Sequence, residues 1–306
     1  MMSEVYHDGE KAIQQSVGET LNAERSGSVI TDTIMAGAIN FIEKQPMAIV
    51  SSVDKNGQVW ASLLIGDFGF VKVPNPNALV FDGNLISSAK SDIFYENIAK
   101  IPQIGLLFIE LASRRRFKIN GVPTIQNGKI EVKIQEAYPN CPKYIQKRVI
   151  SLPDKFSEII PTIFQGEKLD AVEKNWITKA DTFFVGSQSN EGRLDVNHRG
   201  GNAEFVEILD DFTLKIPDYR GNNMFNTFGN IFQNPNVGLL FIDFEKGNTL
   251  QLTGKAELLF DQKTEIDVQK TGGTGRFWLF KTEKWLRTEN HHKVDWEFLD
   301  YSPFNP

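Results

Sequence analysis

One segment of the chain brings together side chains that can hold an anion or move a proton. It reads Asn197-His198-Arg199-Gly200-Gly201. The imidazole of His198 has an ordinary pKa near neutrality, so it can serve as a general acid or contact a bound ring. The guanidinium of Arg199 can bind a phosphate through two nitrogens. The two glycines let a flat or anionic ligand approach the backbone closely. The alternative is a solvated strand end with a bulge.

A second polar block, LKIPDYRGNNMFNTFGNIF, follows at 214–232. It predicts a strand, a turn at 217–218 and a helix that begins near Asn222 or Asn223. Asparagine is a good N-cap, and a helix N-terminus presents free N–H groups to an anion. Arg220 lies just before this helix, so the two arginines 199 and 220 are predicted to hold a phosphate together. Ordinary helix capping is the alternative.

Two blocks in the first half of the chain could add to such a site. Residues 87–90 read Ser-Ser-Ala-Lys and fall at the corresponding helix start, where they form a second candidate anion cradle. Residues 113–117 read SRRRF. Side chains alternate along a strand, so Arg114 and Arg116 are predicted to share one face, with Arg115 on the other. The alternative for the arginines is a charged edge that deters sheet pairing.

Three further features are open to a functional and a structural interpretation. Cys141 is predicted at a helix N-terminus beside basic residues, as a redox thiol or as a structural residue. Trp278 is predicted either to stack on a bound ring or to lie in the core. His291-His292 is predicted to lie in a surface loop, because no further metal ligands accompany it.

The chain contains the same pattern twice. NIAKIPQIGLLFIE at 97–110 and NIFQNPNVGLLFID at 230–243 are identical at eight of fourteen positions. Upstream, VSSVDKNGQVWAS at 50–62 corresponds to VGSQSNEGRLDVN at 185–197. Two blocks in the same order and at nearly equal spacing indicate two copies of one strand-rich domain. In this register, Leu63 and Leu64 of the first copy stand where the second has histidine and arginine. This favours the second copy as the site, and two unequal sites per chain are the open alternative.

The remaining segments are predicted to flank the two copies. Apolar residues at helical spacing predict helices within 9–24 and 32–44, and the motif at 7–10 is a candidate helix cap. A helix is predicted from Pro142 through 150, and another over about 166–178. Alternation predicts strands at 130–137 and 275–285, and the aromatic, proline-rich tail is predicted to be an extended cover.

Composition limits the class of protein. The chain has 306 residues, which favours two domains, and its net charge is −6, which argues against duplex DNA as a partner. No stretch is long and apolar enough for a membrane span, and the N-terminus does not resemble a signal peptide. One cysteine excludes an internal disulfide. A soluble cytoplasmic protein is therefore expected.

These residues also carry a family resemblance. The Arg199-Gly200-Gly201-xxx-Phe205-Val206 step, the IPDYRGNN turn and the NPNVGLLF strand together resemble the pyridoxamine 5′-phosphate oxidase-like, FMN-binding split-barrel superfamily. AYPNCPKYIQ, TGGTGRFW and the terminal WEFLDYSPFNP resemble its long, duplicated subgroup. The oxidases' helix-start motif resembles Ser-x-Arg-Lys. The second copy lacks the lysine of this phosphate-binding motif and the first copy its arginine. The sequence also has no clear match to the basic and aromatic residues with which the oxidases bind pyridoxal phosphate, so the resemblance does not extend to pyridoxamine phosphate as substrate.

The resemblance implies a mainly β (α+β) protein in which two tandem six-stranded antiparallel Greek-key split barrels form an intrachain pseudo-dimer with peripheral helices. The expected segments are an N-terminal helical part (1–45), barrel 1 (46–138), a helical connector (139–180), barrel 2 (181–290) and a C-terminal cover (291–306). FMN is the expected cofactor, with deazaflavin and haem as alternatives. It would bind where the barrels meet.

The expected function is that of an FMN-dependent oxidoreductase, which transfers hydride or electrons between flavin and a small molecule or NAD(P)H. Non-enzymatic flavin or haem binding and purely structural barrels are the alternatives. The expected partners are a small-molecule substrate and an electron donor, with a second copy of the chain as an open alternative, and neither nucleic acid nor membrane. His198 is the candidate catalytic residue. The candidate cofactor-binding residues are Asn197, His198, Arg199, Pro217, Asp218, Arg220, Asn222, Asn223, Ser88, Lys90, Arg116 and Trp278.

Overall fold

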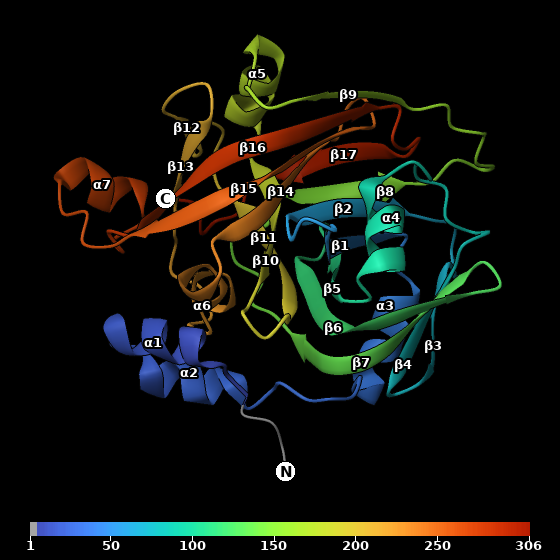
Figure 1. Cartoon of the computed structure of the whole chain (residues 1–306), viewed down its shortest axis with the longest axis horizontal. Helices are drawn as coiled ribbons and strands as arrows, with labels where there is room; N and C mark the ends of the chain where they lie inside the picture. Colours follow the sequence, from blue (N-terminus) through green and yellow to red (C-terminus); the bar gives the residue numbers. More distant parts are fainter. Residues whose placement is uncertain (1–4) are drawn as a thin grey trace.

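The computed structural model describes residues 5–306 and shows two large antiparallel sheets flanked by helices (Figure 1). The mainly β architecture predicted from the sequence is confirmed. No helix in the described part of the chain combines the length and apolar character needed to cross a membrane.

The first sheet has seven strands, hydrogen-bonded in the order β2-β1-β5-β6-β7-β4-β3. These strands are β1 (Met47–Val53), β2 (Val59–Ile65), β3 (Val71–Asn75), β4 (Ala78–Asp82), β5 (Ile104–Glu110), β6 (Arg115–Gln126) and β7 (Lys129–Pro139). All neighbours are antiparallel, so each hairpin brings alternate apolar side chains to a common core.

The second sheet follows the order β11-β10-β14-β15-β16-β13-β12, and β9 pairs with β16 outside this path. Its strands are β9 (Thr162–Gly166), β10 (Thr182–Gln188), β11 (Leu194–Gly200), β12 (Glu207–Ile208), β13 (Thr213–Pro217), β14 (Asn236–Asp243), β15 (Asn248–Leu259) and β16 (Phe277–Glu289). Adding nine to each label of the first sheet reproduces this path. Each path holds seven strands rather than six, because a short edge strand, β3 or β12, pairs beside β4 or β13.

The same side-chain contact recurs in both sheets. Asn97 on helix α4 (Ile93–Lys100) donates to the hydroxyl of Ser52 at 3.0 Å. Asn230 on helix α6 (Asn226–Gln233) donates to the hydroxyl of Ser187, also at 3.0 Å. All four side chains are buried, so each bond satisfies polar groups that would otherwise be costly. The repeat in sequence therefore corresponds to a repeat of sheet order and of buried hydrogen bonding.

The two sheets meet through a shared apolar cluster and two close backbone approaches. Ile49 and Leu63 of the first half pack there with Phe184 of the second. Glycine allows the close approach on both sides: a Cβ on Gly105 would lie 3.1 Å from the backbone of Asp195, and one on Gly238 would lie 2.6 Å from the carbonyl oxygen of Val59. The halves therefore pack reciprocally, as an isologous interface does.

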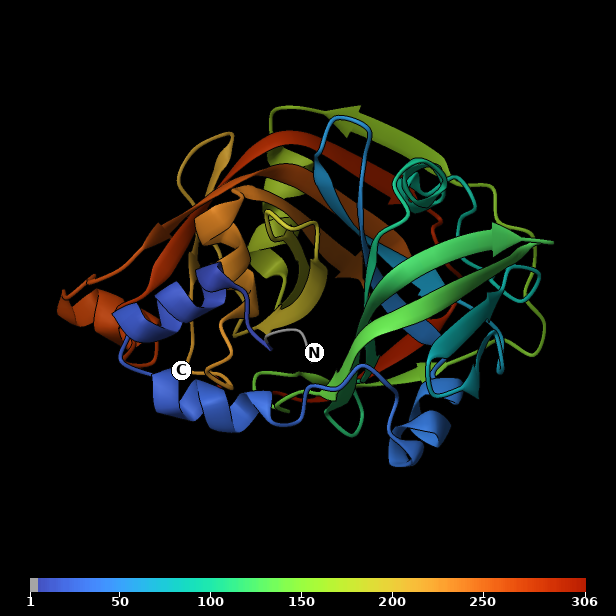
Figure 2. The same cartoon turned by 60° about the horizontal axis from the view of Figure 1, so that its bottom comes forward.

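The remaining helices lie around the sheets. They are α1 (Asp8–Ser16), α2 (Thr20–Gly27), α3 (Ala36–Glu43), α5 (Ala171–Lys179) and α7 (Glu265–Lys270). Figure 2 shows α1 and α2 beside α6 of the second half, while α3 lies beside the first sheet. The helix cap predicted at His7 is confirmed, since its ring accepts from the N–H of Gly9 and Glu10 completes a capping box.

The helix predicted from Pro142 through 150 is wrong. Residues 147–151 form strand β8 (Lys147–Ser151), which pairs with β17 (Asp295–Asp300) in the tail. Tyr144 has a φ of 64°, which interrupts any helix, and the pairing partner lies about 150 residues away, beyond the reach of local pattern. The C-terminal tail, which was predicted to be an extended cover, therefore contains a strand, β17.

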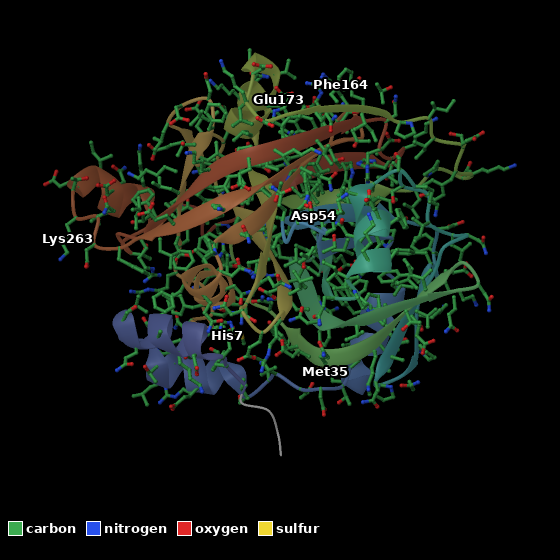
Figure 3. All side chains as sticks on the ribbon, in the orientation of Figure 1. His7, Met35, Asp54, Phe164, Glu173 and Lys263 are labelled. Atoms are coloured by element: carbon green, nitrogen blue, oxygen red, sulfur yellow. The ribbon has the colours of Figure 1, made fainter. Side chains whose placement is uncertain are left out.

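Two other predicted helix starts are shifted. The start of α6 is at Asn226 rather than 222–223, because Asn223 and Phe225 take left-handed φ values of 63° and 59°. The predicted helix over 166–178 begins at 171. The residues before it form β9, where Phe164 covers the guanidinium of Arg287 at 4.4 Å while Glu173 binds the same group at 2.5 Å. Figure 3 shows Phe164 and Glu173 together at this edge.

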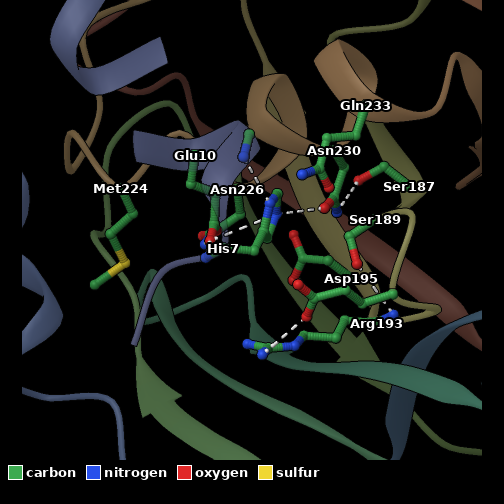
Figure 4. Close-up of polar contacts among 12 residues, drawn as sticks. His7, Glu10, Ser187, Ser189, Arg193, Asp195, Met224, Asn226, Asn230 and Gln233 are labelled. Carbon is green, nitrogen blue, oxygen red and sulfur yellow. Dashed lines mark hydrogen bonds and ion pairs between the residues drawn. The ribbon is translucent and has the colours of Figure 1, made fainter. Parts of the chain in front are cut away.

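Helix α1 is joined to α6 by a buried polar cluster (Figure 4). Gly9 and Gly229 let the two backbones approach closely. His7 Nε2 lies 2.9 Å from Asn230 Oδ1, and Asn226 donates to Glu10 at 2.5 Å. Burial raises the pKa of the Glu10 carboxyl to about 7, although the hydrogen bonds from Asn226 and from the backbone N–H of His7 lower it. A carboxyl at this position resists ionisation.

We expect the stability of the fold to depend on pH through Glu10. Its folded pKa is raised, so its contribution is complete below its unfolded pKa near 4.5 and is lost as pH rises through about 7. Glu10→Gln does not ionise, so the variant should gain about 1–3 kcal/mol relative to wild type between pH 5 and pH 8. Urea unfolding at the two pH values measures this.

Burial lowers the pKa of the neighbouring His7. Its effect on the stability of the fold is therefore opposite to that of Glu10, because stability is lost as pH falls below the ordinary pKa of histidine. His7 is present in both proteins, and so are Asp195, Glu136 and Arg193, so their effects largely cancel in the comparison. A stability difference between Glu10→Gln and wild type that stays constant with pH contradicts the assignment.

Candidate functional site

The main polar cleft lies where β11 of the second sheet faces β6 of the first, covered by residues 140–144 that follow β7. It is lined by Arg116, Asn140, Cys141, Lys143, Tyr144, Asn197, His198, Arg199, Gly200, Phe205, Pro217, Asp218, Tyr219, Gly221 and Asn222. A second hollow adjoins it at the start of α6 and adds Asn223 and Thr227 to the shared residues. Seven of the twelve sequence-predicted residues line the main cleft, and Asn223 lines the adjoining hollow.

His198 is the most unusual residue of the cleft. Its side chain is 3% exposed, and neither ring nitrogen has a hydrogen-bond partner. Burial lowers its pKa well below the ordinary value, and the cations of Arg116, Arg199 and Arg148 lower it further. The ring is therefore neutral at pH 7, with one N–H donor and one acceptor free. This changes the role expected from the sequence, because a neutral imidazole is a poor general acid.

Two arginines from different sheets provide positive charge in the cleft. The Nε of Arg199 is buried without a partner. Arg116 donates from Nε to the carbonyl oxygen of Cys141 at 2.6 Å. Burial and the neighbouring Arg199 lower the pKa of Arg116 to about 10, so both guanidiniums remain charged at pH 7. Two like charges in a half-buried wall favour an anion between them.

A buried network fixes the strand that carries these residues. Lys118 of β6 forms an ion pair with Asp195 and donates to Asn197 at 3.3 Å. Asn197 in turn donates to Thr227 at the start of α6, at 2.9 Å. The lysine is fully buried, so its charge is stable only because the Asp195 carboxylate is close. Both sheets and α6 are thereby joined beneath the cleft.

The loop between β13 and α6 forms the opposite wall. The carboxylate of Asp218 binds Arg276 at 2.9 Å. Burial lowers the pKa of the Arg199 guanidinium, and the charge of Asp218 acts against this by raising it. Tyr144 and Tyr219 contact each other across the mouth, with ring centroids 5.0 Å apart. The hydroxyl of Tyr144 donates to the carbonyl oxygen of Arg220 at 3.0 Å, which closes the mouth. The cleft and the adjoining hollow each enclose only about 70 Å³ in this state.

Four sequence-predicted residues lie elsewhere. The side chain of Arg220 is exposed and lines neither hollow. Trp278 is fully buried in the core of the second sheet. Ser88 and Lys90 line a different groove in the first half, where the lysine donates to the carbonyl oxygen of Gly83 at 2.7 Å. The hydroxyl of Ser88 accepts from the N–H of Ile65 at 3.2 Å.

Several local predictions are corrected here. Arg114 does not share a face with Arg116, because its φ of 58° places it in the turn before β6. Cys141 lies in a loop rather than at a helix N-terminus. His291 and His292 are buried, not in a surface loop, because the segment after β16 folds inward. No group of three or more metal-ligating side chains gathers anywhere in residues 5–306.

In the first half, the strand that corresponds to β11 has its polar groups bound by the chain itself, while the groove of Ser88 and Lys90 lies at the counterpart of the loop before α6. Gln251 takes the place of Lys118 and donates to Ser62, the counterpart of Asn197, at 2.8 Å. His291 Nε2 lies 2.9 Å from the carbonyl oxygen of Leu63, the counterpart of His198. Ser62 also donates to the buried carboxylate of Asp92 at 2.7 Å. This place holds a carboxylate and apolar side chains where the cleft holds arginines, so it does not suit an anion.

The sequence reasoning missed Lys118 and the two tyrosines. Lys118 has the same parity as Arg116 along β6, so extending the alternation by two residues would have found it. Tyr144 reaches the cleft from the segment before β8, which was predicted as helix. Tyr219 was within the quoted turn but had no local signal that distinguished it from a core aromatic.

The comparisons with known proteins concern this second half. A family model described as pyridoxamine 5′-phosphate oxidase matches residues 169–285, which carry β10 to β15 and most of β16. The chain thus resembles the pyridoxamine 5′-phosphate oxidase-like proteins, as predicted, over the part that holds His198 and Arg199. A comparison with curated protein sequences finds no match.

Solved structures with some similarity each cover about two fifths of this chain. HupZ of Group A Streptococcus, in a variant form, is 14% identical over 39% of this chain and 98% of its own, with a TM-score of 0.33. A putative pyridoxamine 5′-phosphate oxidase of Lactobacillus delbrueckii is 17% identical over 39% and 94%, with a TM-score of 0.33. An FMN-binding protein of Syntrophomonas wolfei is 10% identical over 42% and 95%, with a TM-score of 0.26.

We expect His198→Leu, which copies the first half, to stabilise the fold by about 1–3 kcal/mol, because it removes two buried ring nitrogens without partners. The gain should grow as pH falls below about 6.5, since a histidine with a lowered folded pKa costs stability there. Urea unfolding at pH 7.5 and pH 5.5 measures both effects. A loss of stability at both pH values would show that the ring has partners or packing that the leucine lacks.

Proposed function

We propose that the protein is a flavoprotein that binds FMN in the cleft between its two halves and acts as an oxidoreductase. The observation that carries this proposal is a cationic cleft whose buried polar atoms lack partners: His198 has two and Arg199 one. Unsatisfied buried donors are costly, so a ligand that accepts their hydrogen bonds would stabilise the site. The match of the second half to the pyridoxamine 5′-phosphate oxidase model supports the choice of ligand.

The two hollows suit the two ends of such a ligand. In this proposal the phosphate lies near Arg199, Asn223 and Thr227, at the start of α6, where free backbone N–H groups favour an anion. The ring lies toward His198 and Arg116, where a neutral imidazole can both donate and accept a hydrogen bond. Asn197, Pro217, Asp218 and Asn222 complete the walls.

Entry of the ligand requires the cleft to open. Cofactor pockets usually enclose several hundred Å³, far more than this cleft in its closed state. The bond from Tyr144 to the carbonyl oxygen of Arg220 spans the mouth, so we propose that it breaks as the ligand enters.

When bound, FMN would supply the redox chemistry, while the chain would supply binding, ring orientation and protection from water. His198 would orient the ring by hydrogen bonding rather than transfer a proton as an imidazolium. Arg116 and Arg199 would favour the anionic groups of the ligand. The substrate and the electron donor are not defined by these contacts.

The direct test replaces one arginine at a time. Arg199→Leu, which again copies the first half, should weaken FMN binding about 10- to 100-fold, because a charge-assisted hydrogen bond is removed. Arg220→Leu is the matched control and should change affinity less than about twofold, since its side chain is exposed and outside the cleft. Flavin fluorescence titration measures both. Wild-type protein that neither contains nor takes up FMN would refute the proposal.

The strand of the first half that corresponds to β11 leads to a second prediction. We expect one flavin per chain, because Asp92 and His291 occupy the place of a second site. Absorbance and mass of the ligand released from a known amount of protein give the ratio. Two flavins per chain would contradict this assignment, and released haem would favour the haem-binding alternative. A bound flavin that neither NADH nor NADPH reduces would favour a non-enzymatic binding protein.

A further inference from the structure

A separate cavity of about 330 Å³ lies between the first sheet and the two-stranded sheet of β8 and β17. It shares no lining residue with the cleft around His198. Its volume is within the range of small-molecule pockets. Most of its wall is apolar, with side chains that include Met47, Leu111, Ile150 and Leu152. Apolar surface of this kind favours a ligand with a hydrocarbon or aromatic body.

Two buried donors line this cavity without a partner. One is Nη1 of Arg148, whose side chain is about nine-tenths buried. The other is Nε1 of Trp296. The arginine is firmly placed, because Nη2 binds Asp181 at 2.6 Å and the guanidinium lies 4.2 Å from the ring centroid of Phe244. Its remaining N–H group is therefore fixed toward whatever occupies the space beside it.

The strand register places the two donors on one face. Trp296 pairs with Ile150 across β8 and β17, and Arg148 lies two residues before Ile150. Residues two apart on a strand point to the same side, and such diagonal neighbours are about 7–8 Å apart. Both side chains line the cavity, so the register brings their two donors to the same wall. Lys44 and Glu110 also line the cavity and carry one charge of each sign.

We propose that this cavity is a second binding site, which takes a small apolar carboxylate. The carboxylate accepts hydrogen bonds from Arg148 and Trp296, and the hydrocarbon body lies against Ile150 and Leu152. This site shares no lining residue with the proposed flavin site, although the charge of Arg148 acts on His198. An uncharged apolar molecule would leave the arginine donor poorly satisfied, because hydrogen bonds to charged partners are the stronger ones.

The test compares octanoate with 1-octanol by isothermal titration calorimetry on the full chain. We expect octanoate to bind at least tenfold more tightly than the alcohol. Trp296→Phe keeps the apolar surface and removes one donor, so it should weaken octanoate binding about 3- to 10-fold. Ile150→Trp should fill the cavity and abolish binding. Arg25→Leu, on the exposed face of α2, is the matched control and should bind octanoate as the wild type does.

Three results would overturn the proposal. The first is failure of octanoate to bind the wild type, which would mean that water satisfies the two donors. The second is equal affinity for octanoate and octanol. The third is unchanged octanoate binding in Trp296→Phe. The comparison of acid and alcohol uses wild-type protein alone, so a variant that fails to fold does not remove the test. Octanoate binding can be measured whether or not FMN is bound, so failure here is distinct from failure of the flavin proposal.

Discussion

The two sheets are held together where a glycine of each lies against the backbone of the other. Gly105 of β5 meets Asp195, and Gly238 of β14 meets Trp60, the counterpart of Asp195 in the repeat. A side chain at Gly238 would push the halves apart, because it would lie 2.6–2.7 Å from backbone atoms of Val59 and Trp60. At Gly105 the approach to the backbone of Asp195 is 3.1 Å, so a side chain there would require a smaller shift. This contact sets β11 against β5 and its neighbour β6. Arg116 and Lys118 thereby lie beside Asn197 and Arg199, although they are about 80 residues away in sequence.

The two halves pack in a pseudo-symmetric way, but the corresponding sites on β2 and β11 differ in how well their buried groups are satisfied. In the first half, Leu63 and Leu64 are fully buried in apolar clusters. Ser62 donates to one oxygen of Asp92 and accepts from Gln251, while the other oxygen of Asp92 is buried without a partner. In the second half, the corresponding strand buries an imidazole and a guanidinium with free nitrogens. Unsatisfied buried polar groups reduce stability, and such local losses are typical of binding sites. The difference between the halves is therefore best explained by a ligand that only one end receives.

The repeat, the antiparallel sheets and the cleft residues of β11 and β13 were predictable, because they depend on local alternation and on a comparison of the chain with itself. Arg116 was predicted as a contribution from the opposite half, and the structure places it in the cleft with His198 and Arg199. The failures have a common physical cause. Residues 147–151 form a strand only because β17, about 150 residues later, pairs with them. Likewise, His291 is buried because the first half offers the carbonyl oxygen of Leu63.

The tail also determines which wall of the cleft can move. The backbone of Tyr144 is fixed on both sides, since its N–H donates to Ser302 at 3.2 Å and its carbonyl oxygen accepts from the buried Gln146, also at 3.2 Å. Gln146 in turn accepts from the N–H of Ser302 at 2.7 Å and donates to Gly201. On the opposite wall, Asn223 and Phe225 hold left-handed conformations that cost energy in residues other than glycine. Strain does not distinguish the two walls, because Tyr144 has a left-handed φ of 64° as well. We propose that the cleft opens at the loop from Tyr219 to Phe225, because the wall of Tyr144 is braced by the tail.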